Sequence, residues 1–553
     1  MDTNNEKWNN SGLFNSTEEY NKEVKLTFDK QLPLWLKGCL YRNGPGQFEL
    51  NNDPKTSVNH PFDGFAYIQK YKIDGQSNTI YFQSSFIKSH TYKESLKHGH
   101  LTTRQFASDP CKTIFGRFQL IFSAMNGQLF TDDTGVTIQR VNNELLALTE
   151  TIPGYIIDEN TLDTVAPLVT LPYAEELKTE ILTLTTAHVM YDSKRKMTVG
   201  YATRMTRSNG QWLDVIFIYD NEEQNNLSST TDLNNNEADF DEGGRFLSIT
   251  RNMNERGKKY NNSIKSQTKS FRYNYEHGAS YMHSASITED FLILSEIPLH
   301  FSLKKSLGTL LSGKVLTDMF KWNESLPTYF RIINLDNGEE IARISGPGFF
   351  TFHHINAYQM KDSIIIDICA YDDHRLVKEL SLNKLRENIF PSGLGFIRRF
   401  HLNLNTKRCT EPFENVRQLS HEQTYPISYK NSLVPIQIDL PRINSNFTGK
   451  FYRFIYAVRG PPNYFFDALV KIDIESQQVT GLWKEPCTSP SEPIFVPKPD
   501  SLEEDDGIIL TIVFEQQTNK SFILLLDAKT FQELTRAYLP VHIPFSLHGN
   551  FYN

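Results

Sequence analysis

Short runs of β-branched and aromatic residues recur along the whole chain, and this pattern constrains the fold more than any other feature. Examples are residues 78–83, 196–201, 291–296, 362–368, 451–457 and 521–527. Asn, Asp, Gly or Pro bounds most of these runs, which is typical of β-strands that end in tight turns. Helical periodicity is weak and is found mainly over residues 303–320 and 376–388. The pattern argues against alternating βαβ units and predicts an all-β protein.

A chain of 553 residues would ordinarily divide into roughly three or four domains, but a closed all-β architecture can grow larger as one unit. A propeller protects its sheet edges by arranging small sheets around an axis. We therefore predict a single β-propeller domain over residues 21–553, although the sequence contains no clean WD or kelch-like repeat. The polar residues 1–20 are predicted to form a flexible tail.

Residues 221–244 are rich in Ser, Thr, Asn, Asp and Glu and contain few apolar side chains. Such a segment cannot bury enough surface to offset the entropy lost on ordering. We predict a flexible surface insertion here, and the alternative is a short partner-binding element within it.

Charge and hydropathy exclude several classes of protein. The chain carries 57 Lys and Arg against 65 Asp and Glu, a formal net charge of −8. Binding to a phosphate backbone normally requires a basic excess, so we expect no nucleic-acid partner. The longest apolar runs, such as residues 507–514, are far shorter than the roughly 20 residues that span a bilayer. The polar N-terminal residues do not resemble a signal peptide, which predicts a cytoplasmic location.

The cysteines give no sign of a disulfide framework. There are five of them, spread widely and without a CxxC pair: Cys39, Cys111, Cys369, Cys409 and Cys487. An odd number at such spacing also argues against a thiolate zinc site. We expect reduced thiols.

Four of the 15 histidines stand within or beside apolar, strand-like sequence: His188, His283, His353 and His548. Each of them, taken alone, fits a hydrogen-bonded core histidine better than a metal ligand. The gaps of 95, 70 and 195 residues between them match no local zinc or haem motif. Composition and spacing alone therefore do not assign these residues to a site.

Several sequence blocks, in order, carry a resemblance to a known family. They are residues 34–46 (LWLKGCLYRNGPG), 60–64 (HPFDG), the segments around the four histidines, 491–496 (SEPIFV) and 502–507 (LEEDDG). Together these blocks resemble the carotenoid cleavage oxygenases, the family that includes the beta-carotene oxygenases and the retinoid isomerohydrolase of the retinal pigment epithelium. The resemblance runs along nearly the whole chain.

The resemblance implies a seven-bladed β-propeller with a cap of helices and loops over its metal-bearing axis. It also implies one non-haem Fe(II) per chain, held by His188, His283, His353 and His548. Imidazole nitrogen suits Fe(II), and four neutral ligands leave room in an octahedron for dioxygen. Blades far apart in sequence contribute residues to one axis, which agrees with the wide spacing. His354 follows His353 on an alternating strand and is expected on the opposite side.

In the family, carboxylates orient the ligating imidazoles, and the matching positions here are Glu150, Asp439 and Glu492. Asp439 departs from the glutamate that is usual in the family. Because its side chain is one methylene shorter, either the strand lies closer to the histidine or a water molecule bridges the two.

A candidate membrane contact lies at residues 109–122, where Ile, Phe and Leu alternate with Lys112 and Arg117. This mixture is expected of an interfacial amphipathic helix, and its Asp-Pro-Cys-Lys core is similar to the membrane-binding segment of animal members of the family. Cys111 is a candidate for acylation, and the alternative is an ordinary buried thiol in a covering helix. We predict a peripheral membrane protein.

The function implied by the resemblance is an Fe(II)-dependent dioxygenase that cleaves a conjugated double bond of a carotenoid or apocarotenoid with O2, giving aldehydes such as retinal. One alternative on the same scaffold is a retinoid isomerohydrolase, in which the metal acts as a Lewis acid on an ester. The other is a non-catalytic propeller that binds partners, with the four histidines as core residues.

Overall fold

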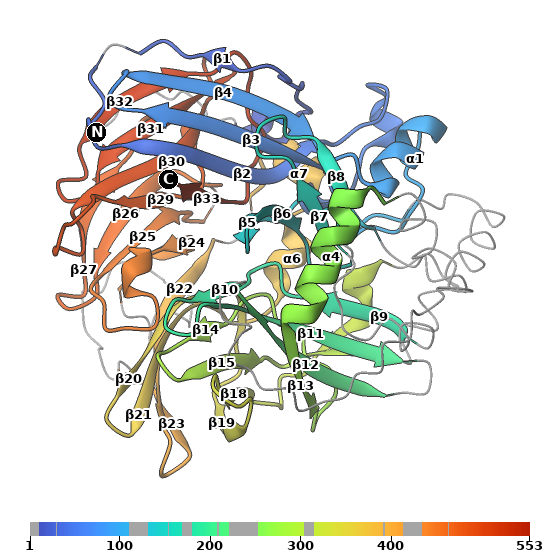
Figure 1. The fold of residues 1–553 in the computed structure, drawn as a ribbon, viewed down its shortest axis with the longest axis vertical. Coiled ribbons are helices and arrows are strands. Elements are labelled where there is room, and N and C mark those ends of the chain that lie inside the picture. Colours follow the sequence, from blue (N-terminus) through green and yellow to red (C-terminus); the bar gives the residue numbers. More distant parts are fainter. Residues whose placement is uncertain are drawn as a thin grey trace.

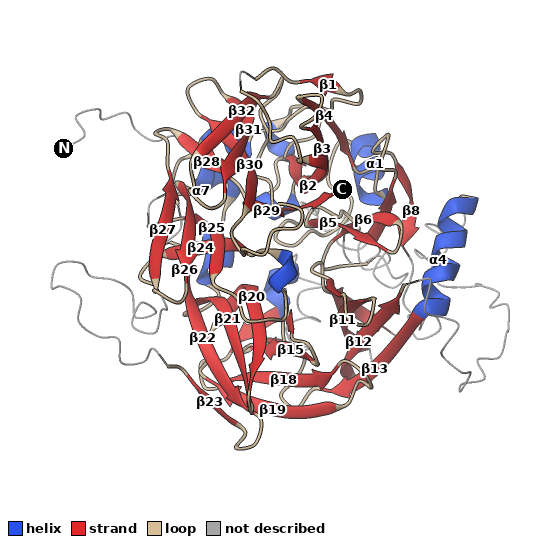
Figure 2. Cartoon of the chain, turned by 60° about the vertical axis from the view of Figure 1, so that its left-hand side comes forward, coloured by secondary structure: helices blue, strands red, loops and turns tan. Residues whose placement is uncertain are grey.

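Antiparallel strands make up most of the molecule. The computed structural model describes residues 10–28, 30–109, 131–152, 154–168, 180–206, 210–220, 253–302, 315–390, 393–412, 434–462 and 464–553. Its sheets follow one another in a ring (Figures 1 and 2). All six predicted strand runs overlap observed strands. The first three residues of the run 451–457 lie outside its strand, which begins only at Phe454.

One sheet joins the two ends of the described chain. Its strands, in spatial order, are β1 (Val24–Lys25), β4 (Thr79–Phe86), β3 (Phe65–Asp74), β2 (Lys37–Gln47) and β33 (His548–Tyr552). The last strand pairs with β2, and Asn43 lies opposite His548 in the register. The buried Arg42 supports this pairing, since its guanidinium donates to the carbonyls of Glu492 and Leu547.

Three further sheets follow in sequence order. The first contains β5 (Thr137–Val141), β6 (Glu144–Leu148), β7 (Gly154–Ile157) and β8 (Thr164–Leu168). The second contains β9 (Glu180–Thr185), β10 (Met190–Asp192), β11 (Met197–Thr206), β12 (Gln211–Tyr219) and β13 (Thr268–Asn274). The third contains β14 (Ser286–Ile287), β15 (Phe291–Glu296), β18 (Thr328–Asn334) and β19 (Glu340–Gly346), and β16 (Leu299–Phe301) pairs separately with β17 (Phe320–Trp322).

The next sheet has eight strands, and a short ladder divides it. One half contains β20 (Phe350–Met360), β21 (Ser363–Tyr371), β22 (Gly395–Asn403) and β23 (Arg408–Thr410). The other half contains β24 (Gln437–Arg442), β25 (Phe454–Arg459), β26 (Ala468–Asp473) and β27 (Gln478–Trp483). Only Gly395 and Phe396 of β22 pair with β24, so each half is nearly a four-stranded unit of its own.

The remaining sheet contains β28 (Thr488–Pro490), β29 (Ile494–Pro497), β30 (Gly507–Glu515), β31 (Lys520–Asp527) and β32 (Glu533–Tyr538). Its central strands β30 and β31 are apolar on both faces and almost wholly buried. The described helices are few: α1 (His90–His98), α4 (Glu255–Gln267), α6 (Arg375–Glu379) and α7 (Leu382–Arg386). Of these, α4 lies at the outer edge of the ring (Figure 2). In the part of the chain that the structure describes, no helix is both long and apolar enough to cross a membrane.

The two regions with helical periodicity have different outcomes. The periodicity over 376–388 corresponds to two short helices, α6 and α7. Of the region 303–320, residues 303–314 lie outside the described residues, and the rest forms a single 3₁₀ turn (Leu316–Met319) before β17. The apolar residues of this region that the structure describes, Leu316, Met319 and Phe320, are buried.

The predicted flexible tail over 1–20 is too long. From Asn10 onward the chain is packed, and a 3₁₀ turn (Ser11–Phe14) buries the ring of Phe14 against Phe465, with ring centroids 5.3 Å apart. The guanidinium of Arg386 also donates to the carbonyl of Phe14. The contact of Phe14 with Phe465 and the hydrogen bond from Arg386 thus hold this mostly polar segment against the rest of the molecule. The predicted insertion over 221–244 lies outside the described residues.

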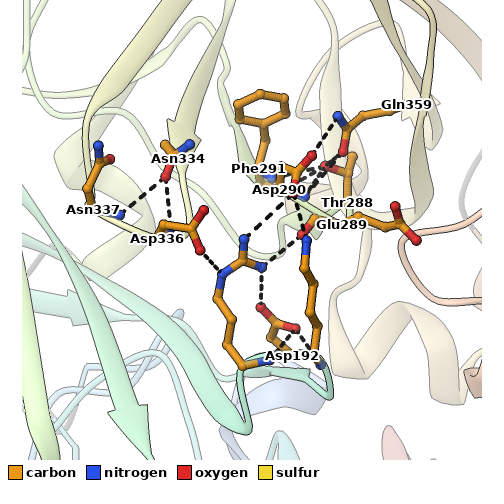
Figure 3. A network of polar contacts seen from close by, with 11 residues as sticks. Asp192, Thr288, Glu289, Asp290, Phe291, Asn334, Asp336, Asn337 and Gln359 are labelled. Carbon is orange, nitrogen blue, oxygen red and sulfur yellow. Dashed lines mark hydrogen bonds and ion pairs between the residues drawn. The ribbon is translucent and has the colours of Figure 1, made fainter. Parts of the chain in front are cut away.

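A polar network connects three neighbouring sheets at their turns (Figure 3). Arg195, in the turn before β11, donates to Asp192, to the carbonyl of Glu289 and to Asp336, at distances of 2.9, 2.8 and 2.6 Å. Gln359 on β20 donates to Asp290 at 3.1 Å and so extends the network to the third sheet. The Arg195 side chain and its partner Asp192 are only 10% and 7% exposed, whereas Asp336 is 67% exposed, so the charge-assisted bond to Asp192 is the one that is shielded from solvent.

We expect Arg195→Met to lower the free energy of unfolding by about 2 kcal/mol, because it removes hydrogen bonds between charged groups that link separate sheets. The midpoint of urea unfolding measures this change. Lys194→Ala is the matched control, since Lys194 contacts Asp290 of the same network but is 59% exposed, and it should cost less than about 0.5 kcal/mol. Equal effects of the two substitutions would contradict the structural role of Arg195.

Candidate metal centre

Four histidines from separate parts of the chain meet at one point. His188 lies between β9 and β10, His283 between β13 and β14, His353 on β20, and His548 at the start of β33. Each offers one ring nitrogen, and these four nitrogens all lie within 4.8 Å of one another. The Nε2 atoms of His188 and His283 are 2.9 Å apart, and those of His353 and His548 are 3.2 Å apart.

Irregular pairing on β20 separates His353 from its neighbour. The register with β21 shifts between Thr351 and His354 and again between His354 and Asn356. Such bulges redirect side chains. His353 turns toward the other three histidines, whereas Nδ1 of His354 contacts Ser286 Oγ at 3.2 Å. His354 thus lies outside the cluster and contacts Ser286 instead.

Three of the four imidazoles are each held by a carboxylate. Nδ1 of His283 lies 2.5 Å from Glu150 Oε1, and Nδ1 of His353 lies 2.6 Å from Asp439 Oδ1. Nδ1 of His548 lies 2.8 Å from Glu492 Oε1.

The carboxylates determine which nitrogen faces the centre of the cluster. An ionised carboxylate only accepts hydrogen bonds, so each of the three Nδ1 atoms carries the proton and each Nε2 presents a lone pair. His188 has no carboxylate partner among the described residues. Lone pairs that face one another at about 3 Å, as between His353 and His548, repel unless a cation lies between them. The donor set therefore fits a metal ion.

Burial favours the neutral form of two of the imidazoles, His188 and His548. It lowers the pKa of His188 well below the usual range, and the neighbouring histidines lower it further. Burial also lowers the pKa of His548 to about 4, although Glu492 acts in the opposite direction. Neutral imidazole is the form that binds metals, so these two rings are prepared for coordination near neutral pH.

Asp439 reaches His353 directly, so no bridging water is needed. Burial alone would raise the pKa of Asp439, but His353 and Tyr371 hold it below the usual range. The Tyr371 hydroxyl donates to the second oxygen of this carboxylate. A bulge follows in β24, and Leu440 there has a φ of 49°, a left-handed conformation that is rare for a large side chain.

Each carboxylate is itself fixed by a further group. Tyr281 donates to Glu150 at 2.7 Å, and Tyr371 does the same for Asp439. Glu492 instead accepts from the guanidinium of Arg442, at 2.8 and 3.2 Å. Burial would raise the pKa of Glu492, but Arg442 and His548 together bring it below the usual range.

The charges also favour a cation. Arg442 pairs with Glu492, whereas Glu150 and Asp439 are held by hydroxyl and imidazole groups. Asp439 is buried and Glu150 largely so, and neither contacts a cationic side chain among the described residues, which leaves negative charge that a divalent ion would balance.

An apolar cavity borders the histidine cluster. Its empty volume is about 1250 Å³, part of it open to solvent. The wall includes His283, His353 and His548. Most of the remaining lining is aromatic or aliphatic: Phe62, Phe106, Val136, Leu316, Phe352, Leu376, Leu380, Leu394, Leu440, Tyr464, Phe465, Phe466, Phe545 and Leu547. A long apolar molecule could lie along this wall beside the cluster.

Sequence reasoning missed the residues that fix the carboxylates: Tyr281, Tyr371 and Arg442. Tyr281 had a usable signal, because it lies two residues before His283 in strand-like sequence and so shares its face. Tyr371 and Arg442 had none, since only the sheet pairing brings them to their partners. Cys111 and the segment 109–122 proposed for membrane contact lie outside the described residues, except for Asp109.

The fold and the cluster define a ring of β-sheets with a histidine site for a metal ion beside an apolar cavity. The chain belongs to the retinal pigment epithelial membrane protein (RPE65) family, whose model matches residues 13–553.

Known relatives are similar to this chain in sequence over nearly its whole length. The mitochondrial carotenoid-cleaving dioxygenase of Macaca fascicularis is 29% identical, over 98% of this chain and 94% of that protein. The beta,beta-carotene 15,15'-dioxygenase of Gallus gallus is 28% identical, over 98% and 97% of the two chains. The solved structure of the cobalt-substituted apocarotenoid oxygenase (ACO) of Synechocystis has the same fold, with a TM-score of 0.73, 21% identity and 98% of both chains covered.

We expect Asp439→Ala to weaken metal binding by roughly 10- to 100-fold, because His353 would lose the group that fixes its orientation and tautomer. Competition titration of the purified metal-free protein with Co²⁺ and a coloured chelator measures the affinity. Glu255→Ala is the control, since Glu255 is a carboxylate with a side chain 92% exposed. Unchanged affinity in Asp439→Ala would contradict the orienting role.

Proposed function

We propose that this protein is an Fe(II)-dependent dioxygenase that cleaves a conjugated double bond of a carotenoid or apocarotenoid with O2, giving aldehydes such as retinal. The observation that carries the proposal is the position of the histidine cluster in the wall of a large apolar cavity. The names of the macaque and chicken relatives, both dioxygenases that act on carotenoids, point to the same reaction.

The metal in the proposal is a single Fe(II), held by His188, His283, His353 and His548. Four neutral imidazoles suit Fe(II) and leave positions free for other ligands. Bound iron would supply the activation of dioxygen. The chain itself supplies the rest: Glu150, Asp439 and Glu492 orient three of the rings through their Nδ1 protons.

The cavity gives the chain its second task, which is to position the substrate. Phe352 lines the cavity next to the cluster, and its ring centroid is 5.2 Å from that of His283. Aromatic rings and aliphatic side chains make up most of the wall, so they exclude water and let an apolar substrate lie against them. The bond that is cleaved would then be the one that the wall places beside the histidines.

The fold in the proposal is a seven-bladed propeller within one domain. Four sheets and the closing sheet formed by β1–β4 and β33 would be one blade each, and the eight-stranded sheet would be two blades joined by its short ladder. Loops and the helices α6 and α7 would form the cap; α6 contributes Leu376 to the cavity wall, and Leu380 follows it.

A peripheral position on a membrane completes the proposal, since a polyene dissolves in bilayers rather than in water. Residues 109–122 with Cys111 remain the candidate contact. A single acyl chain gives only marginal binding, so the attachment would be reversible. The cytoplasmic face is the proposed location, although the macaque relative is named as mitochondrial.

The test is product analysis with labelled oxygen. Iron-loaded protein in detergent micelles is incubated with β-carotene or an apocarotenal under ¹⁸O2, and the aldehydes are trapped by borohydride reduction before they exchange with water. We expect shortened aldehydes that carry the label, and after the reduction they are recovered and weighed as the corresponding labelled alcohols. Retinol formed from retinyl ester without oxygen uptake would instead support the isomerohydrolase, and a protein that binds no iron would support the non-catalytic propeller.

His548→Ala is the matched variant for this test. We expect it to lose at least about 100-fold in activity and most of its iron, because it removes a ligand from the cluster. His98→Ala is the control, since His98 lies on the surface of α1 with a side chain 49% exposed. Full activity in His548→Ala would overturn the assignment of the site.

A further inference from the structure

One acidic residue stands out in the apolar cavity wall. Asp133 lies in the loop before β5, lines the cavity and is only 8% exposed. Its neighbours on the wall include Phe106 and Val136. A buried carboxyl group in such surroundings normally has its hydrogen-bonding capacity filled, because an unfilled polar atom costs about 1–3 kcal/mol.

The carboxylates of the two neighbouring acidic residues, Asp132 and Asp63, do accept several hydrogen bonds each. Asp132 accepts from the backbone N–H groups of His90 and Thr91, at 3.1 and 2.9 Å, and from the hydroxyl of Tyr155 at 2.7 Å. It thus caps the beginning of α1. Asp63, which also lines the cavity, accepts from Ser108 Oγ at 2.6 Å and from the N–H of Ala107.

Asp133 differs from both. Its Oδ2 accepts from the N–H of Ala66 at 2.9 Å, but its buried Oδ1 has no hydrogen-bond partner among the described residues. Burial and then Asp132 raise the pKa of Asp133 well above the usual range, and the Ala66 N–H and the Ser89 hydroxyl only partly oppose this. The protonated form is therefore favoured, and a protonated carboxyl group can donate a hydrogen bond.

We propose that Asp133 binds an oxygen atom of the substrate, so that the cavity selects polyenes that bear a carbonyl or hydroxyl group over pure hydrocarbons. This inference rests on the proposed function and names its substrate class. An oxygenated ligand fills the vacant hydrogen-bonding position of Asp133, whereas a hydrocarbon leaves it unpaired and pays the cost of burying it.

The anchor also has a consequence for the reaction. The same cavity reaches His283, His353 and His548. A polyene held at its oxygen by Asp133 cannot slide along the apolar wall, so the distance from that oxygen to the histidine cluster determines which double bond is cleaved. A pure hydrocarbon has no oxygen for Asp133 to hold, so its position along the cavity is not fixed in this way.

The test compares two probes, β-apo-8'-carotenal and β-carotene, by equilibrium binding and by KM. Asp133→Leu removes the donor and should weaken binding of the apocarotenal by about 10-fold or more, while binding of β-carotene changes by less than about 2-fold. Asp133→Asn keeps an acceptor for the Ala66 N–H and a donor for the ligand, and should stay within about 3-fold of the original protein. Equal losses for both probes, or no loss in Asp133→Leu, would overturn the proposal.

Two further measurements keep the result decisive. If Asp133→Leu does not fold, the unsubstituted protein is titrated with the apocarotenal and with the same polyene carrying a methyl group in place of the aldehyde; equal affinities would overturn the proposal. Binding is followed by quenching of tryptophan fluorescence, which does not require turnover. Discrimination in binding without any cleavage would therefore refute the proposed function and leave the role of Asp133 standing.

Discussion

The structure depends above all on the pairing of β33 with β2. This ladder joins the C-terminal strand to a sheet otherwise built from the N-terminal region. It places His548 opposite Asn43, and the buried Arg42 ties the same strand to the segment that carries Glu492. Closure of the sheet and completion of the histidine cluster are thus one event. Because these contacts span most of the chain, the cluster forms only when the whole fold has formed.

Buried polar groups around the cluster form a hierarchy. Imidazoles face the centre, carboxylates hold three of the imidazoles, and Tyr281, Tyr371 and Arg442 hold the carboxylates. Each layer restricts the rotamers of the layer inside it, which gives a rigid donor set. His188, which lacks a carboxylate partner in the described part of the chain, is the least restrained of the four and the place where the geometry can adapt to an incoming ligand.

Much of this could be predicted from the sequence, and the limits have physical causes. Strand periodicity gave the fold class, and ordered blocks gave the histidines and their carboxylates. Local pattern was not sufficient where tertiary contacts decide the structure: Phe14 is buried in a segment that composition assigns to a free tail. Asp133 carries no signal at all, because an Asp-Asp pair normally indicates a solvated turn. Only its burial and its vacant oxygen distinguish it.

The left-handed backbone at Leu440 places two demands on a single position. A large side chain in this conformation costs on the order of 1–3 kcal/mol, which the surrounding packing must offset. The same side chain forms part of the cavity wall and follows directly on Asp439. Glycine would release the strain but open the wall, and any bulkier residue would reshape the wall while keeping the strain. Position 440 is therefore where the stability of the backbone and the shape of the cavity depend on the same side chain.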